Sequence, residues 1–188
     1  MVSSHFIEKT EKREFWLQGP VPGISPLLQP IAHALLQAHE EVTALVEGFP
    51  EERLWHRPAG VASPGFHLQH LAGVLDRLFT YAKGQALSRQ QLDDLAMEGN
   101  PGPGMSTIPN LLGHFHRKVD QALEQLAVTD PATLTAACGV GRAKIPSTVG
   151  GILFHAAEHI QRHTGQLLVT IRVLLDGPGG NPWEQKAV

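Results

Sequence analysis

The chain has 188 residues, with 15 Lys and Arg against 18 Asp and Glu, which gives a formal net charge of −3 at pH 7. This length supports one domain with a full hydrophobic core, and a hydrophobic fraction of 42% excludes a disordered chain. The slightly acidic balance provides no basic surface for nucleic acid. No apolar stretch reaches the roughly 18 residues that a membrane helix needs. The single cysteine, Cys138, cannot form an internal disulfide. We therefore expect a cytoplasmic protein with no nucleic-acid or membrane partner.

Four long segments carry apolar residues at steps of three and four, which is the periodicity of a helix with one buried face. Proline and glycine residues bound these segments, as is typical of helix ends. A shorter helix is expected to begin after Ser88, which can cap it together with Gln91. The four long helices are predicted over residues 27–48, 63–83, 106–127 and 148–175, and the short one over 88–97.

These segments predict an all-α fold, a four-helix bundle that forms one domain over residues 1–188. Its core is expected to span about residues 24–175. An extended N-terminal lead-in precedes this core, and a Pro/Gly-rich tail from Gly177 to Val188 follows it. The connections between the first and second long helices, and between the third and fourth, are too long to fix a simple up-down topology. Residues 130–148 are expected to form a connection with one irregular extended piece.

Eleven histidines are the most unusual feature of the composition. In the last long helix, His155, His159 and His163 follow one another at four-residue steps. Two histidines at this spacing have Cβ atoms about 6 Å apart and can bind one metal ion, whereas the outer two lie about 12 Å apart along the helix. His159 is therefore expected to pair with His163 or with His155. Ile160 and Leu167 place His163 on the core side of the helix.

A third ligand would have to come from another helix, and the second long helix offers His67 and His70 beside apolar residues. Cofactor sites in helical bundles form from inward side chains on adjacent helices. Three histidines with an open fourth position are the catalytic zinc arrangement, whereas structural sites have four protein ligands. The spacing thus indicates a divalent metal site. The alternative, in which these histidines only pack in the core, stays open.

The motif His67-Leu-Gln-His70-Leu and the sequence HAAEHIQRHTGQL at residues 155–167 resemble the DinB/YfiT-like superfamily of candidate metalloenzymes. The resemblance covers about residues 24–175. It implies a divalent ion held by one histidine of the second helix and an H-x-x-x-H pair of the fourth, which here are His70, His159 and His163. His67 is then a candidate proton shuttle or a packing residue. Whether His67 or His155 joins or replaces a ligand stays open.

The sequence departs from the family pattern at two positions. Ile160 follows His159 where the family often has Glu, and Thr164 stands where it often has Arg. Metal ligation needs neither residue, but chemistry that depends on that acid or that Arg does not carry over. Gly165 matches the family, and we expect another helix to approach closely there. Asp76 and Arg77 are expected to form surface ion pairs, and Glu158 to face solvent.

The resemblance implies a metal-dependent transferase or hydrolase that acts on a small molecule, with a low-molecular-weight thiol as a candidate cosubstrate. Zinc and nickel both suit three nitrogen ligands, and the open position would take water or thiolate. The alternative is a non-catalytic, metal-stabilised bundle that binds a ligand or a partner. The catalytic residues stay unknown. A homodimer is expected, because bundles of this family often pair and twofold dimers are the commonest assembly. A substrate pocket is expected where the second helix begins, between residues 51–64 and 100–106.

Overall fold

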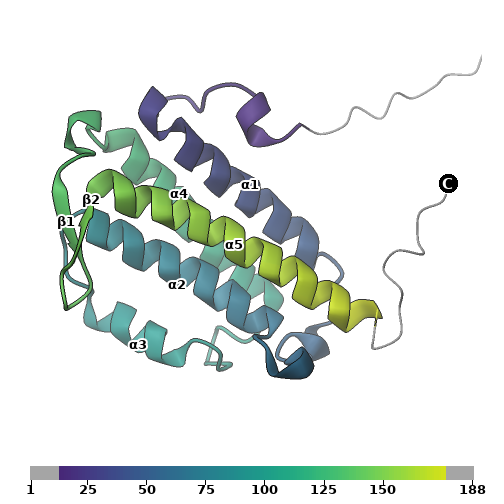
Figure 1. Cartoon of the computed structure of the whole chain (residues 1–188). Coiled ribbons are helices and arrows are strands. Elements are labelled where there is room, and N and C mark those ends of the chain that lie inside the picture. The colour runs from purple at the N-terminus through teal and green to yellow at the C-terminus, as the bar shows by residue number, and fades with distance from the viewer. Residues whose placement is uncertain (1–12, 177–188) are drawn as a thin grey trace, which may run out of the picture.

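A computed structural model describes residues 13–176 of the chain (Figure 1). The first part of the expected lead-in, residues 1–12, and the Pro/Gly-rich tail, residues 177–188, lie outside the described residues. The described part of the lead-in contains two short 3-10 turns, Phe15–Leu17 and Pro26–Leu28, and the second leads directly into the first helix. Within the described part of the chain, no helix combines the length and the apolar character that crossing a membrane requires.

The all-α prediction is confirmed, and the five helices lie close to their predicted ranges. Their local signals are intact, since the Ser63 hydroxyl accepts the amide of Phe66 and Ser88 forms a reciprocal capping box with Gln91. Prolines occupy the first turns of the first, second and fourth helices, where a missing N–H does no harm. The helices are α1 (Gln29–Val46), α2 (Pro64–Ala82), α3 (Arg89–Met97), α4 (Ile108–Val128) and α5 (Val149–Asp176).

The four long helices form the bundle, with α3 lying against its outside next to α2 (Figure 1). Helix α5 packs on α1 and α2, and α4 packs on the same two helices. The pairs α1 with α2 and α4 with α5 therefore occupy opposite corners. The long connections 47–63 and 129–148 cross these diagonals, which explains why short loops could not join these helices. As a result, α2 and α5 lie side by side.

The connection between α4 and α5 contains a small antiparallel hairpin in place of the single irregular extended piece that the sequence predicts. Its strands are β1 (Ala137–Val140) and β2 (Ile145–Thr148), with Val140 opposite Ile145. The turn includes Gly141 at a φ of 71°, a conformation that glycine adopts without steric cost. The thiol of Cys138 donates to the carbonyl of Tyr81 over 2.9 Å, which ties the hairpin to the end of α2.

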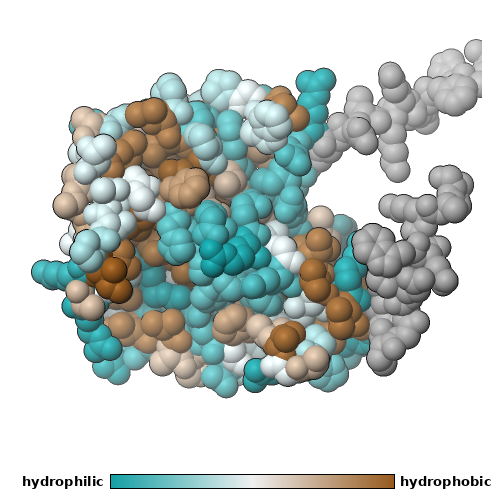
Figure 2. Space-filling view, viewed as in Figure 1, coloured by the Kyte–Doolittle hydropathy of each residue, from teal (hydrophilic) through white to brown (hydrophobic). Residues whose placement is uncertain are grey.

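The apolar faces of the long helices meet in one core. Its large, fully buried side chains include Phe115, Leu35, Leu71, Leu75, Leu126, Leu153 and Ile160. Figure 2 shows the opposite, outward side of α5, where hydrophilic residues gather over the middle of the helix and hydrophobic residues lie toward its C-terminal end. Val169 and Val173 belong to this second group, at 62% and 50% exposed.

Candidate metal centre

The structure brings His70, His159 and His163 together between α2 and α5. The Nε2 atoms of His70 and His159 lie 3.1 Å apart. The ring of His163 lies 4.4 Å from the ring of His70 and 4.5 Å from that of His159, measured between centroids. One nitrogen from each ring lies within 4.8 Å of the other two, so the three side chains could hold one metal ion.

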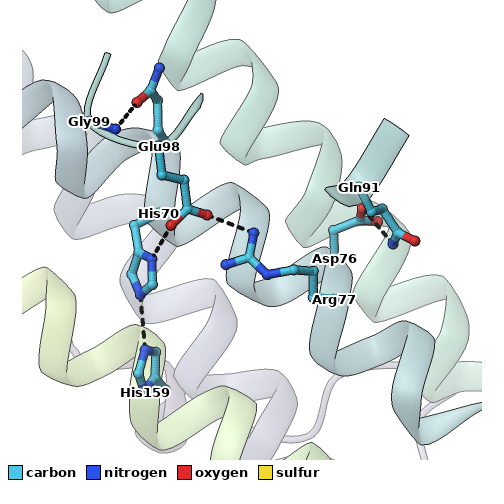
Figure 3. Close-up of polar contacts among 8 residues, drawn as sticks. His70, Asp76, Arg77, Gln91, Glu98, Gly99 and His159 are labelled. Atoms are coloured by element: carbon cyan, nitrogen blue, oxygen red, sulfur yellow. Dashed lines mark hydrogen bonds and ion pairs between the residues drawn. The ribbon is translucent and has the colours of Figure 1, made fainter. Parts of the chain in front are cut away.

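The helical packing explains this convergence. The four-residue step from His159 to His163 moves one turn along the same face of α5, and that face lies against α2. His70 comes from the second turn of α2 and points toward α5 (Figure 3). All three side chains are only partly buried, so a ligand could reach them from solvent.

Glu98, which directly follows α3, contacts the His70 ring on the side away from His159 (Figure 3). The Nδ1 hydrogen of His70 is donated to Glu98 Oε2 over 2.8 Å, and Arg77 Nη1 donates to Glu98 Oε1 over 2.6 Å. A carboxylate only accepts hydrogen bonds, so Nδ1 of His70 carries the donated proton, and Nε2 is the nitrogen of this ring that could bind an ion. This is the arrangement in which a carboxylate orients a metal-binding histidine.

Gly73 makes room for this ion pair on the surface of α2. A Cβ atom at Gly73 would lie 2.6 Å from Arg77 Nη1 and 2.6 Å from Glu98 Oε1. No other residue type lets the two charged groups lie so close to the helix. The expected surface role of Arg77 is wrong, since Arg77 is only 8% exposed and its partner is Glu98. Asp76 does form an outer ion pair, with Lys118.

Burial favours the neutral form of His159 and His163. Desolvation, with smaller contributions from neighbouring positive groups, lowers the pKa of His163 to about 4, and it lowers the pKa of His159 as well. Burial alone would raise the pKa of Glu98, but the hydrogen bond from His70 and the charge of Arg77 outweigh it and leave this pKa below its usual value. At neutral pH the site therefore combines the neutral imidazoles of His159 and His163 with a charged carboxylate.

Two observations fit a divalent ion at this place. The buried Nδ1 atom of His163 has no hydrogen-bond partner among the described residues, and its lone pair could bind an ion. In a regular tetrahedral site with Zn–N bonds of about 2.0–2.1 Å, neighbouring nitrogens lie about 3.3 Å apart. The distance of 3.1 Å between His70 and His159 is close to this value. The three nitrogen donors suit zinc and nickel alike.

A second possible ligand group around His159 includes two further residues of α5, His155 and Glu158. His155, Glu158 and His159 also offer ligand atoms within 4.8 Å of one another. His155 is exposed, however, and Glu158 pairs with Arg162 and with His155. The exposure of His155 and the ion pairs of Glu158 make the inner group, with His70 and His163, the better candidate. Burial and charge thus favour His163 over His155 as the partner of His159.

His67 lies beside the three histidines but outside their group. Its ring centroid is 5.7 Å from that of His163. The side chain is 4% exposed, and its Nδ1 has no hydrogen-bond partner among the described residues. Burial, followed by the charge of His70, lowers the pKa of His67 to about 4. The expected close approach of a helix at Gly165, two residues after His163, is wrong, since a Cβ there would meet no atom within 4 Å.

Comparison with known proteins adds the family. A search of curated proteins finds no match to this sequence. The family model for the DinB superfamily matches residues 34–167, which is most of the chain and includes α2, the α3 segment with Glu98, and both histidines of α5 that face His70. The chain belongs to the DinB superfamily.

Proposed function

We propose that the chain binds one divalent ion, zinc or nickel, through His70, His159 and His163, and that it is a metal-dependent transferase or hydrolase for a small molecule. The observation that carries this proposal is the meeting of three imidazoles from two helices, with one of them oriented by Glu98. No carboxylate belongs to this group, so a bound ion would keep its full charge of +2.

A divalent ion in such a site supplies a Lewis acid that lowers the pKa of a water or a thiol at an open position. The protein contributes the remaining parts. His70 presents a lone pair because Glu98 holds its Nδ1 proton. Arg77 keeps Glu98 charged and in place. The partly buried rings of His159 and His163 stay unprotonated at neutral pH and so remain able to bind a cation.

Metal analysis of the full chain, purified without a histidine tag, tests the metal site. We expect about one zinc or nickel per chain and loss of this ion in His163→Ala. His114→Ala serves as the matched control, because His114 lies on α4 in a different cavity. Equal metal content in the two variants, or no metal in the parent chain after supplementation, would contradict the proposal.

The open position can be tested with cobalt, whose absorption spectrum reports its ligands. In Co(II)-loaded protein, azide is expected to change the visible spectrum because it takes a position that no side chain occupies. The alternative function, a non-catalytic bundle stabilised by metal, requires a fourth protein ligand such as His67 or His155. In that case azide leaves the spectrum unchanged in the parent chain and changes it in the variant that lacks the fourth ligand.

A further inference from the structure

A cavity of about 510 Å³ lies beside the candidate metal centre. It is formed by Val61 and Ala62, in the turn before α2, and by α5 from Arg162 to Thr170. Figure 1 shows that the turn before α2 and the C-terminal half of α5 lie at the same end of the bundle, and the two elements are in contact. Small-molecule pockets usually measure about 300–1,000 Å³, so this cavity has the size of a substrate site.

His67 connects the cavity with the metal centre. It lines the cavity, and its ring lies 5.7 Å from the ring of His163. Its side chain is only 4% exposed, yet its Nδ1 has no hydrogen-bond partner among the described residues. A buried polar atom without a partner is costly, and such atoms in native proteins usually serve a ligand or a water. A molecule in the cavity could bind this atom and still reach the histidines.

The charge of the lining favours an anion. Arg162 is the only formally charged side chain among the residues that line the cavity. One of its nitrogens, Nη2, pairs with Glu158, which does not belong to the lining. The planar guanidinium has five N–H donors in a fork that matches a carboxylate. Gln166, one turn further along α5, adds an amide to the same wall.

Apart from Thr170, the rest of the lining is apolar or has no side chain. Val61 and Val169 provide aliphatic surface, although both are more than half exposed in the structure. Gly165 lies between Arg162 and Val169 on α5, and a Cβ there would point into open space. The missing side chain therefore keeps this wall of the cavity open.

We propose that this cavity binds a small carboxylic acid with an aliphatic body, which is the substrate of the metal centre. Its carboxylate binds Arg162, its body lies on Val61 and Val169 over Gly165, and a polar atom binds His67. This assignment rests on the proposed metal function, because it requires the reacting group of the bound acid to lie at the three histidines.

The probe for this test is hexanoate, compared with hexan-1-ol and hexylamine, each titrated into the zinc-loaded and the metal-free full chain by NMR. We expect hexanoate to bind most tightly. Gly165→Leu adds a side chain to the wall of the cavity at a position where its Cβ meets no atom within 4 Å, and Arg162→Gln removes the charge. Each variant is expected to weaken hexanoate binding by about tenfold or more. Arg172→Gln changes an exposed arginine of the same helix outside the cavity and is expected to leave the affinity unchanged.

The zinc affinity of each variant is measured in parallel, and we expect it to stay unchanged. Equal binding of the three probes would overturn the assignment of an anion. If hexanoate binding requires zinc but is unchanged in Gly165→Leu and Arg162→Gln, hexanoate binds the ion alone, which also overturns the proposal. The parent chain could fail to bind zinc while the metal-free protein still binds hexanoate and loses this binding in Gly165→Leu. That result would contradict the metal function but support the carboxylate site.

Discussion

The carboxylate of Glu98 accepts a hydrogen bond from His70 at 2.8 Å and another from Arg77 at 2.6 Å. One side chain from the end of α3 thus fixes both the tautomer of a candidate metal ligand and the position of a buried arginine. The two contacts use different oxygens, so they require a carboxylate, in which both oxygens accept hydrogen bonds.

Glu98→Gln is expected to weaken zinc binding roughly 10- to 100-fold. An amide offers one oxygen where His70 and Arg77 each need an acceptor, so one of these two donors loses its partner. Competition with a chromophoric chelator measures the affinity. Asp94→Asn on the exposed side of α3 is the matched control and should keep the parent value. Similar affinities for Glu98→Gln and the parent chain would show that Glu98 does not orient the site.

Gly73→Ala is expected to leave the fold intact and to weaken zinc binding about tenfold. The new Cβ would displace the flexible ends of Arg77 and Glu98, each at 2.6 Å, and so remove the support of His70. Gly113→Ala in α4 is the control, because its Cβ would only meet an arginine tip at 3.5 Å. That change should add about 1 kcal/mol of helix stability without altering metal affinity. Thermal unfolding and chelator competition on both variants separate the two effects.

The stability of the metal-free protein is expected to fall as the pH drops from about 6.5 to about 4. The pKa values of His67 and His163 are about 4 in the folded chain, against an ordinary value of 6.5. In this window the unfolded chain binds protons that the folded chain does not, so acid favours unfolding. Urea unfolding of chelator-treated protein at several pH values measures the slope. His67→Gln should make the slope shallower, whereas the same change at exposed His56 should not. A slope that is equal in all three proteins would contradict these assignments.

Zinc is expected to raise the stability of the parent chain, because it binds the folded state only. At a free concentration of 100 times the dissociation constant, the gain is about 2.7 kcal/mol. His163→Ala should unfold at the same midpoint with or without zinc, while His114→Ala should respond as the parent does. Calorimetric scans with and without the ion provide the measurement. A zinc response that survives in His163→Ala would place the ion elsewhere.

The sequence predicted the helices well because their signals are local. Apolar spacing marks the buried face of each helix, and Ser63 and Ser88 mark the starts of α2 and α3 by the same hydrogen bonds that the structure shows. The meeting of α2 with α5 followed from family resemblance and bundle geometry. The roles of His70, His159 and His163 as ligands stay a prediction.

The parts that sequence reasoning missed depend on contacts between distant segments. Glu98 lies at the end of a polar, exposed helix, and only the return of the chain toward α2 brings it to His70, which is 28 positions away. Arg77 looks like a surface residue in a helical pattern, yet Glu98 covers it. One signal was available in Gly73, a glycine inside a helix without a local reason. A glycine inside a helix indicates that other atoms approach closely, which the structure shows at Gly73 but not at Gly165.

His70 and His159 stand 89 positions apart in the chain, but His159 and His163 are separated by a single helical turn. Closing so long a loop costs conformational entropy that the local pair does not need to overcome. During folding, α5 alone offers two imidazoles, and the third arrives only when α2 docks against it. For the proposed metal site, we therefore expect tight binding of an ion only after tertiary assembly, with nascent or partly folded chains binding metal weakly and releasing it to stronger chelators.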